Sequence, residues 1–376
     1  MQLGQERSWR HFDWALAATA VALVAYGLAL IYSGSLTNYS GKPLAVLTHP
    51  VARQALFAAV GIVAMFALAR LHYHRWYTLA WPLYGASMIA LAAVLVIGTS
   101  NFGARRWLFE VAGFQFQPSE VAKLATIIAL ARYFSVDPER ARTVRGFLVS
   151  LGIAGLPAAL TLVEPDLGTA TVFLLIWVVV AFVAGVRVRH LGVLTLVGVL
   201  LVPFVLVFGL SSYQRDRLRT FVSPEKYERE GGYNIIQAEV AIGGGGLFGK
   251  GLTHGTQTQL EFLRTQTTDY VFSVLGEELG FTGALVLFGL FTLLLMRGIR
   301  TASVAPDQFG RLLVLGGAML ILGQAFINVA VNVRLFPVTG IPLPFISAGG
   351  TAMLTMFVCL GLVESVALRH RELRYR

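Results

Sequence analysis

The sequence predicts an all-α polytopic integral membrane protein with about ten transmembrane helices. Only 50 of its 376 residues are Lys, Arg, Asp or Glu, which is 13% and about half the share found in soluble globular domains. Hydrophobic residues make up 56% of the chain. They gather in runs of about 20 residues, the length that a helix needs to cross a bilayer, and these runs recur throughout the chain. We therefore expect a single membrane domain over residues 1–376.

Ten apolar runs are the candidate spans. The first is too long for a cleaved signal peptide, so we count it as an uncleaved span. The fourth is the least apolar of the ten. The spans cover approximately residues 12–33, 51–69, 76–97, 118–134, 144–163, 168–185, 191–210, 270–296, 312–333 and 346–368.

Basic residues predict the orientation of these spans. The N-terminus, the even-numbered loops and the C-terminal tail carry 17 Lys and Arg, whereas the short loops on the opposite side carry 5. Because the Lys and Arg of short loops stay in the cytoplasm, both termini are predicted to be cytoplasmic. The large loop between the seventh and eighth spans, residues 211–269, is then extracytoplasmic. Loops of that length are usually functional or disordered, and this one has enough aromatic residues to pack on the bundle.

Composition excludes several classes of protein. The net charge of +10 fits the cytoplasmic loops of a membrane protein better than nucleic-acid binding, so we expect no nucleic-acid partner. Cys359 is the only cysteine, which excludes a disulfide within the chain. No zinc-protease, serine-hydrolase or nucleotide-binding motif occurs, and no metal-ligand cluster is predicted.

Glu120 and Lys123 lie near the start of the fourth span, where charge is costly. They are three residues apart, so they share a helix face and can pair. The pair either stabilises the bundle as a neutral structural unit or lines a substrate cavity.

Arg105 and Arg106 are adjacent in the predicted outer loop before that span. Two guanidinium groups suit phosphate oxygens, which Arg binds through paired hydrogen bonds. The alternative is an anchor at the membrane interface, assisted by Trp107.

Glu164 and Asp166 occupy the very short outer turn between the fifth and sixth spans. Asp166 precedes Gly168 and Thr169 and suits the N-cap of the sixth span. These residues alone favour a structural role, with a role in a site as the alternative.

Asp269 follows a polar run and immediately precedes the eighth span. An Asp at this position can cap the helix. It can also lie at the outer mouth of a membrane cavity, where burial raises its pKa and makes it a usable base. Glu277 follows eight residues later, on roughly the same helix face.

Three other features mark the outer half of the predicted bundle. Residues 337–344 contain three prolines, so we expect a broken or re-entrant element there. Asn328 and Asn332 share a face of the ninth span and suit hydrogen bonds between helices. Gly243–Gly246 lacks the pattern of a phosphate-binding loop, so a flexible hinge or close backbone packing is expected.

Short motifs with recognisable order follow one another along the chain. They are Gly103-Ala104-Arg105-Arg106-Trp107, Gln117-Pro118-Ser119-Glu120-x-x-Lys123, Pro165-Asp166-Leu167-Gly168-Thr169, Gly251-x-x-His254-Gly255-Thr256-Gln257, Thr268-Asp269-Tyr270-Val271-Phe272, Glu277-Glu278-Leu279-Gly280 and Pro342-Leu343-Pro344-Phe345-Ile346-Ser347. The ordered set resembles the SEDS family (shape, elongation, division, sporulation) over nearly the whole chain. Residues 337–342 and Gln259–Leu263 resemble its elongation branch, the RodA type, more than its division branch.

This resemblance implies a peptidoglycan glycosyltransferase of the bacterial cytoplasmic membrane. Such proteins polymerise lipid II, a disaccharide-pentapeptide carried on undecaprenyl pyrophosphate, during cell-wall elongation and shape maintenance. They work with a class B penicillin-binding protein, which is a transpeptidase, and other membrane proteins of the elongation complex are expected partners. The family's essential aspartate in the large outer loop aligns with Asp269.

The resemblance also implies roles for individual residues. Asp269 is expected to be the general base for the acceptor hydroxyl. Cationic groups stabilise the charge that develops on the leaving pyrophosphate. No cofactor is required by the sequence, although a divalent cation (Mg or Mn) is a candidate to share that task. The expected substrate-binding residues are Arg105, Arg106, Glu120, Lys123 and Asp166, with Glu120 holding Lys123 in place.

Two other functions stay open at this point. A lipid II flippase or transporter also fits ten spans with broken helices and buried charge. A non-catalytic scaffold of the elongation complex is the second alternative. Four positions depart from the family pattern: Thr267 replaces a usual His, Ala348 an aromatic residue, Thr351 a common Ser and Glu164 a frequent Gln.

Overall fold

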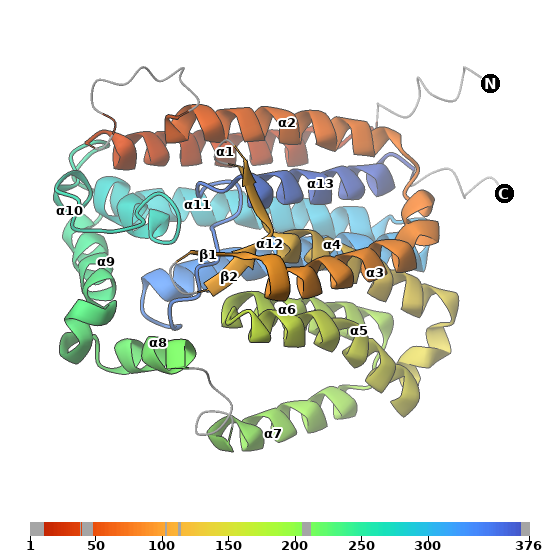
Figure 1. Cartoon of the computed structure of the whole chain (residues 1–376). Coiled ribbons are helices and arrows are strands. Elements are labelled where there is room, and N and C mark those ends of the chain that lie inside the picture. The colour runs from red at the N-terminus through yellow and green to blue at the C-terminus, as the bar shows by residue number, and fades with distance from the viewer. Residues whose placement is uncertain are drawn as a thin grey trace.

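The structure is a computed structural model that describes residues 11–37, 39, 48–101, 104–111, 114–204 and 212–369. Long helices lie side by side and form a bundle (Figure 1). Within the described ranges, eight helices are long and apolar enough to cross a membrane. They are α1 (Trp14–Ser35), α2 (Pro50–Arg70), α3 (His74–Ile97), α5 (Val144–Val163), α6 (Leu167–Ala184), α11 (Val271–Ser303), α12 (Gln308–Asn332) and α13 (Gly350–Ala367).

The two remaining predicted spans are also helical. The fourth is α4 (Pro118–Val136), whose charged residues Glu120, Lys123 and Arg132 lower its hydropathy. The seventh is α7 (Val188–Phe204), which is 17 residues long where the structure describes it. Each of the ten predicted spans therefore corresponds to a helix, and the predicted fold class is confirmed.

Side-chain caps fix where several helices begin. The Oδ1 atom of Asp13 accepts a hydrogen bond from Leu16 N (3.1 Å) at the start of α1. Asp307 does the same for Gly310 N (2.7 Å) at the start of α12. Each cap satisfies a backbone N–H that has no partner within its helix, a gain of about 1 kcal/mol.

The outer part of α11 is broken at Gly280. Gly280 has φ 64° and ψ −159°, and a Cβ there would come 2.3 Å from the backbone nitrogen of Gly249. The chain from the glycine run pairs with the exposed backbone at the break. Phe281 N donates to Gly246 O (2.9 Å), and a second bond joins Lys250 N to Glu277 O (3.0 Å). The glycine run thus packs closely against α11, and the hinge interpretation is wrong.

The helix boundaries differ from the prediction at the last span. Residues 341–349 are not helical, and α13 begins at Gly350 instead of residue 346. The broken element expected over residues 337–344 is therefore present and extends further. A Cβ on Gly27 would lie 2.6 Å from the backbone of Ile346, so α1 packs directly against this segment.

The first and last helices meet at one end of the bundle. Asp13 N donates to Glu364 Oε2 (3.0 Å), and Arg297 forms an ion pair with Asp13 at 2.7 Å. These contacts join the start of α1 to the ends of α11 and α13. The large loop lies at the opposite end, so the start of α1 and the end of α13 are both on the side away from it (Figure 1).

The large loop is mostly helical in the part described. It contains α8 (Ser212–Val222), η4 (Pro224–Glu230), α9 (Gly232–Gly245) and α10 (Thr256–Gln259). A short helix, η2 (Pro138–Arg142), links α4 and α5 at the other end.

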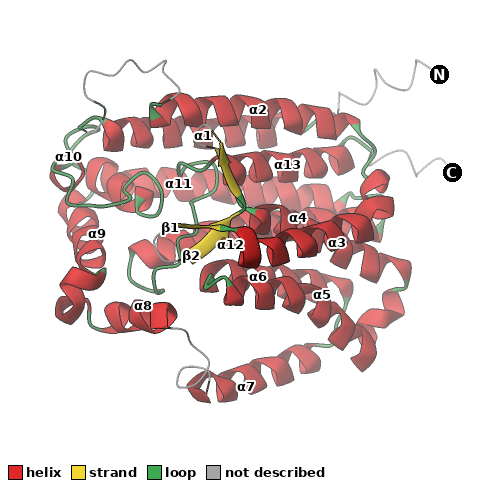
Figure 2. Cartoon of the chain, viewed as in Figure 1, coloured by secondary structure: helices red, strands yellow, loops and turns green. Residues whose placement is uncertain are grey.

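Two small hairpins precede α4 (Figure 2). They pair β1 (Thr99–Asn101) with β2 (Ala104–Trp107) and β3 (Phe109–Val111) with β4 (Phe114–Phe116). The sequence did not predict them, because strands of three or four residues are too short to display an alternating pattern.

Candidate active site

Asp269 lies in a tight turn that enters α11. The backbone N–H groups of Thr268 and Asp269 both donate to Thr265 O at 3.1 Å. The N-cap of α11 is Tyr270, which makes no side-chain cap hydrogen bond. The Asp269 carboxylate is thus not the helix cap, and the capping interpretation is wrong.

Two asparagines of α12 hold the backbone of Asp269. The Nδ2 atoms of Asn328 and Asn332 donate to Asp269 O at 3.1 and 2.9 Å. Asn328 Nδ2 also donates to Ile341 O (2.9 Å), and Asn332 Oδ1 accepts from Ser273 N (3.1 Å). The predicted hydrogen bonds between helices are confirmed, and they fix the turn of Asp269 against the broken segment.

The side chains of Arg106 and Asp269 both come close to Gly340. Gly340 has φ +75°, and a Cβ built on it would come 3.3 Å from Arg106 Nη1 and 3.9 Å from Asp269 Oδ2. A side chain at this position would fill the space between the cation and the carboxylate. Glycine is required here both for its backbone conformation and for that space.

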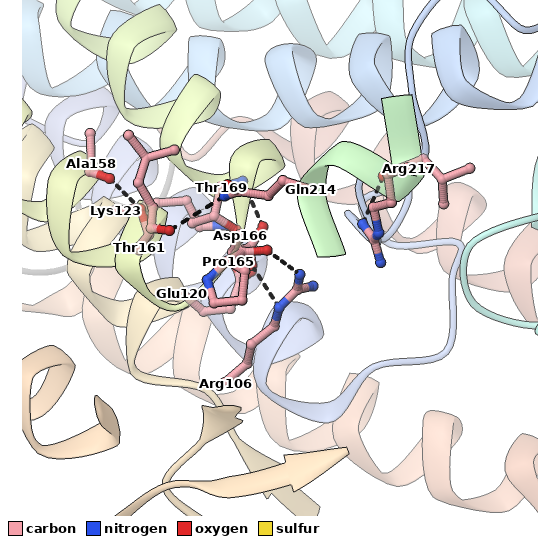
Figure 3. Close-up of polar contacts among 12 residues, drawn as sticks. Arg106, Glu120, Lys123, Ala158, Thr161, Pro165, Asp166, Thr169, Gln214 and Arg217 are labelled. Atoms are coloured by element: carbon pink, nitrogen blue, oxygen red, sulfur yellow. Dashed lines mark hydrogen bonds and ion pairs between the residues drawn. The ribbon is translucent and has the colours of Figure 1, made fainter. Parts of the chain in front are cut away.

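Arg106 reaches this place from β2 and is anchored on the turn between α5 and α6. Its Nη2 donates to Pro165 O (2.8 Å), and its Nε lies 3.7 Å from Asp166 Oδ2 (Figure 3). The guanidinium is buried, and its Nε has no hydrogen-bond partner among the described residues. This Nε faces the Asp166 carboxylate, whose negative charge offsets part of the cost of burying the guanidinium.

Asp166 combines the two roles that the sequence left open. Its carboxylate accepts from Thr169 N and Thr169 Oγ1, both at 3.0 Å, and so caps α6. The same carboxylate forms the ion pair with Arg106. The structural role is confirmed, and the predicted contact with a substrate stays a prediction.

Glu120 and Lys123 pair as predicted. Lys123 Nζ donates to Glu120 Oε1 at 2.6 Å, and both side chains are almost fully buried. Glu120 Oε2 has no partner among the described residues. Figure 3 draws this pair in the same close-up as Asp166 and Arg106, but no hydrogen bond joins the two groups there. The side chain of Arg105 lies outside what the structure describes.

Arg217 is a site residue that the sequence analysis missed. It lies on α8, and its Nη1 donates to Val338 O at 2.7 Å (Figure 3). Its positive charge lowers the pKa of Asp269, as does that of Arg106. Seven basic residues occur in the large loop, so its charge alone did not distinguish it.

Burial is the main electrostatic influence on the two acids of the site. Part of Asp269 stays accessible, but the surrounding protein withdraws its carboxyl from water, and this desolvation raises its pKa above the ordinary value of 3.8. Arg217 and Arg106 oppose the rise, and Asp166 adds to it. The pKa of Glu164 is raised to about 8, mainly by burial and also by the charge of Asp166, while the charge of Arg106 opposes the rise.

The arrangement has a definite chemical capacity. A carboxylate with a raised pKa can accept a proton from a hydroxyl, and nearby guanidinium groups can stabilise charge on a phosphate leaving group. Within the described ranges, no group of three His, Cys, Asp or Glu side chains could hold a metal ion. The divalent cation therefore stays a prediction without a located site.

Comparison with known proteins decides the family. The family model for FtsW, RodA and SpoVE proteins, described as "Cell cycle protein", matches residues 13–372. The chain belongs to this family. FtsW/RodA/SpoVE relatives include the peptidoglycan glycosyltransferase MrdB of Escherichia coli, which is 36% identical over 96% of this chain and 95% of its own length. Stage V sporulation protein E of Bacillus subtilis is 36% identical over 94% of this chain and 96% of its own.

Solved structures of the FtsW/RodA/SpoVE family share the fold. RodA of Thermus thermophilus is 33% identical with a TM-score of 0.69, covering 97% of this chain and 98% of its own. A chain from a peptidoglycan synthase complex, studied for the coordination of polymerisation and crosslinking, is 34% identical with a TM-score of 0.80. It covers 97% of this chain and 99% of its own. The resemblance to the RodA type is confirmed, and the protein is a multi-pass membrane protein.

Proposed function

We propose that this protein polymerises lipid II and that Asp269 is the general base of the reaction. One observation carries the proposal: the Asp269 carboxylate and the Arg106 guanidinium both come close to Gly340 at the outer end of the bundle. The raised pKa of Asp269 supports it, because a base is most effective when its pKa approaches the working pH.

The enzyme class follows from the family. The chain is a peptidoglycan glycosyltransferase, the activity for which its MrdB and FtsW relatives are named. Identity of 36% with each extends over 96% and 95% of this chain, so the relation includes the large loop and every predicted span.

The proposed step is a displacement at the anomeric carbon of one lipid-linked sugar. The acceptor hydroxyl gives its proton to Asp269 while its oxygen forms the new glycosidic bond. The bond between the anomeric carbon and the pyrophosphate oxygen breaks, and its electron pair leaves with the pyrophosphate. Arg106 and Arg217 lie where they can stabilise that negative charge.

Other predicted residues act further from the transfer. Asp166 is proposed to orient Arg106 through the ion pair, and of the two roles left open for the Glu120–Lys123 pair we propose that it borders the substrate cavity. Arg105 keeps its proposed role in binding the pyrophosphate. A divalent cation would add positive charge at the leaving group, but no step depends on it.

The partners and the location are part of the proposal. A class B penicillin-binding protein is the proposed transpeptidase partner, together with other membrane proteins of the elongation complex. One structural relative comes from a synthase complex that couples polymerisation and crosslinking, which supports this assignment. The basic residues support cytoplasmic termini and an extracytoplasmic large loop in the bacterial inner membrane.

The test is polymerisation of lipid II by the purified protein with its cognate class B penicillin-binding protein. We expect long glycan strands from the wild type and a loss of at least about 100-fold for Asp269→Ala, because general bases contribute 10²–10⁴-fold. Asp216→Ala is the matched control: this exposed aspartate of the same loop pairs only with Arg219 among the described residues. The amount and length of the glycan strands made by Asp216→Ala should match those of the wild type.

Each result decides between the functions. Glycan strands from both wild type and Asp269→Ala would support the glycosyltransferase activity and would contradict the role of Asp269 as its general base. No strands from a well-folded wild-type complex would favour the flippase or the scaffold instead. Polymerisation by wild type should also rise with pH through a pKa above 3.8, since the base must be ionised.

A further inference from the structure

A polar cavity of about 440 Å³ lies beside the turn that leads to Asp269 and is lined by residues Thr265 and Thr268 of that turn. It is bounded by the outer ends of α1 and α2, by β4, and by the start of α13. Two of its lining residues are arginines, Arg53 of α2 and Arg264 of the large loop. Neither forms an ion pair with any residue that the structure describes, so two positive charges are left for a ligand.

A buried amide also points to a ligand in this cavity. Gln266 lines it and is only 7% exposed. Its Nε2 donates to Gly34 O at 2.6 Å, while its Oε1 has no partner among the described residues. An unsatisfied buried amide oxygen is unfavourable unless a bound molecule supplies a donor, which a sugar hydroxyl of a lipid-linked saccharide would do and diphosphate oxygens would not.

A single turn of chain separates the cavity from the active site. Thr265 and Thr268 line the cavity, and Asp269 is the next residue. The turn is held in place by Ala348 N, which donates to Thr267 O (2.8 Å), and by Ser347 Oγ, which donates to Thr268 O (2.5 Å). A ligand in the cavity would therefore lie close in the chain to the proposed base, and Arg106 is not among the residues that line the cavity.

The charge of the lining selects an anion. Arg53 and Arg264 contribute two positive charges and Glu261 one negative charge, so the lining carries a net charge of +1. Guanidinium groups bind phosphate oxygens through paired hydrogen bonds, which favours a phosphate-type anion.

We infer that this cavity binds the diphosphate of the acceptor substrate, while Arg106 serves the diphosphate that leaves. The inference rests on the proposed function. Transfer between two lipid-linked saccharides brings two diphosphates to one base, and their like charges require separate cationic sites. The leaving diphosphate gains charge in the transition state, but the acceptor diphosphate does not. The cavity should therefore contribute to substrate binding and not to the rate of the chemical step.

The first experiment counts binding sites. Asp269→Asn protein in complex with its partner is titrated with undecaprenyl pyrophosphate and the bound lipid is counted by native mass spectrometry. We expect two molecules, and one molecule when Arg53→Gln and Arg264→Gln are added. Arg219→Gln, an exposed arginine of α8, is the matched control and should leave two. Undecaprenyl phosphate and free pyrophosphate, run in parallel, distinguish a lipid-linked diphosphate from any small anion.

The second experiment separates binding from chemistry in the active protein. We expect Arg264→Gln to raise KM for lipid II by about 10- to 100-fold while kcat changes less than about twofold, the size expected for a hydrogen bond to a charged group. Arg264→Glu, at an exposed position, should raise KM further and should melt at the wild-type temperature. A fall in kcat with unchanged KM would overturn the inference.

The two proposals fail in different ways. If Asp269→Asn binds no undecaprenyl pyrophosphate, the polymerase mechanism itself is wrong. If it binds the lipid and the two arginine variants change neither the count nor KM, the cavity inference alone is wrong. Equal binding of free pyrophosphate and undecaprenyl pyrophosphate would also overturn it, because a small anion would then be the ligand.

Discussion

Glu277 and Asp269 are two acids at the outer end of α11, eight residues apart, and they are held in opposite ways. The carboxylate of Glu277 is surrounded by donors from the large loop. Its Oε1 accepts from Lys250 Nζ (2.8 Å) and Gln257 N (2.9 Å), and its Oε2 accepts from Thr258 N (3.1 Å) and Thr258 Oγ1 (2.9 Å). All these donors belong to the segment of the loop around α10.

In Asp269 the backbone makes the anchoring contacts. Its carbonyl accepts from Asn328 and Asn332, and its N–H donates to Thr265, while its carboxylate faces Gly340 and Arg106. The difference shows how to tell the two kinds of acid apart. A carboxylate that is fully hydrogen-bonded organises the chain, whereas one whose backbone is fixed and whose side chain faces a cation is available for chemistry.

The largest effect that we expect from the contrast between Glu277 and Asp269 is a local loss of structure in the large loop of the Glu277→Ala variant. The substitution leaves the buried N–H groups of Gln257 and Thr258 without their acceptor. We expect the free energy of local opening of residues 250–259 to fall by on the order of 3 kcal/mol, which is about 100-fold faster hydrogen exchange. Hydrogen exchange with mass spectrometry measures this directly.

The control for this variant is Glu239→Ala on α9. Glu239 is exposed, and its ion pair with Arg334 is long, at 3.4 Å, so exchange should change little. The comparison breaks if Glu277→Ala leaves exchange unchanged yet abolishes polymerisation, since Glu277 would then take part in the chemistry.

A smaller effect is expected from Asn328→Ala, which loosens the backbone of Asp269. The variant removes the hydrogen bonds from Asn328 to Asp269 O and Ile341 O. We expect kcat to fall about tenfold with little change in KM, because a misplaced base slows the step without weakening substrate binding. Steady-state kinetics of lipid II polymerisation gives both constants.

Gln324→Leu provides the matched control on the same helix. Gln324 lies one turn before Asn328 and is fully buried, and its amide has no hydrogen-bond partner among the described residues. Its replacement should preserve kcat. Equal losses in both variants would mean that packing of α12, and not the clamp on Asp269, accounts for the effect.

The membrane fold was predictable from the sequence because apolar runs report span length directly. Each of the ten apolar runs corresponds to a helix, and the three-residue spacing of Glu120 and Lys123 correctly predicted their ion pair. The start of α13 was displaced because residues 346–349 are apolar or small and look helical, although the backbone packs against Gly27 instead. Hydropathy measures burial and cannot distinguish a helix from a buried extended segment.

The candidate site was predictable only in part. Arg106, Asp166 and Asp269 stood out because charges are rare beside spans. Arg217 was hidden among the solvated charges of the large loop, and only the path of α8 brings it to Val338. The roles of Glu277 and of the cavity around Arg53 depend on contacts between segments far apart in sequence, which no local pattern encodes.

The last expected effect is on stability and not on activity, and it concerns Glu164, a third acid, which belongs to neither class. It is buried, its Oε1 has no partner among the described residues, and burial raises its pKa from 4.5 to about 8. Between these two values the folded protein keeps the proton while the unfolded chain releases it. Glu164 therefore lowers stability progressively as pH rises through this window, and the loss is complete above about 8.

Glu164→Gln removes the carboxyl that titrates and therefore tests whether Glu164 differs from both Glu277 and Asp269. We expect its melting temperature to match wild type near pH 4.5 and to exceed it increasingly up to about pH 8, by an amount equivalent to a few kcal/mol at most. Glu139→Gln, which replaces an exposed acid 70% accessible at the opposite end, is the matched control for the loss of a carboxyl group. A constant difference for Glu164→Gln would mean that the carboxyl is already ionised near neutral pH, compensated by Arg106, and that Glu164 belongs with the hydrogen-bonded acids such as Glu277.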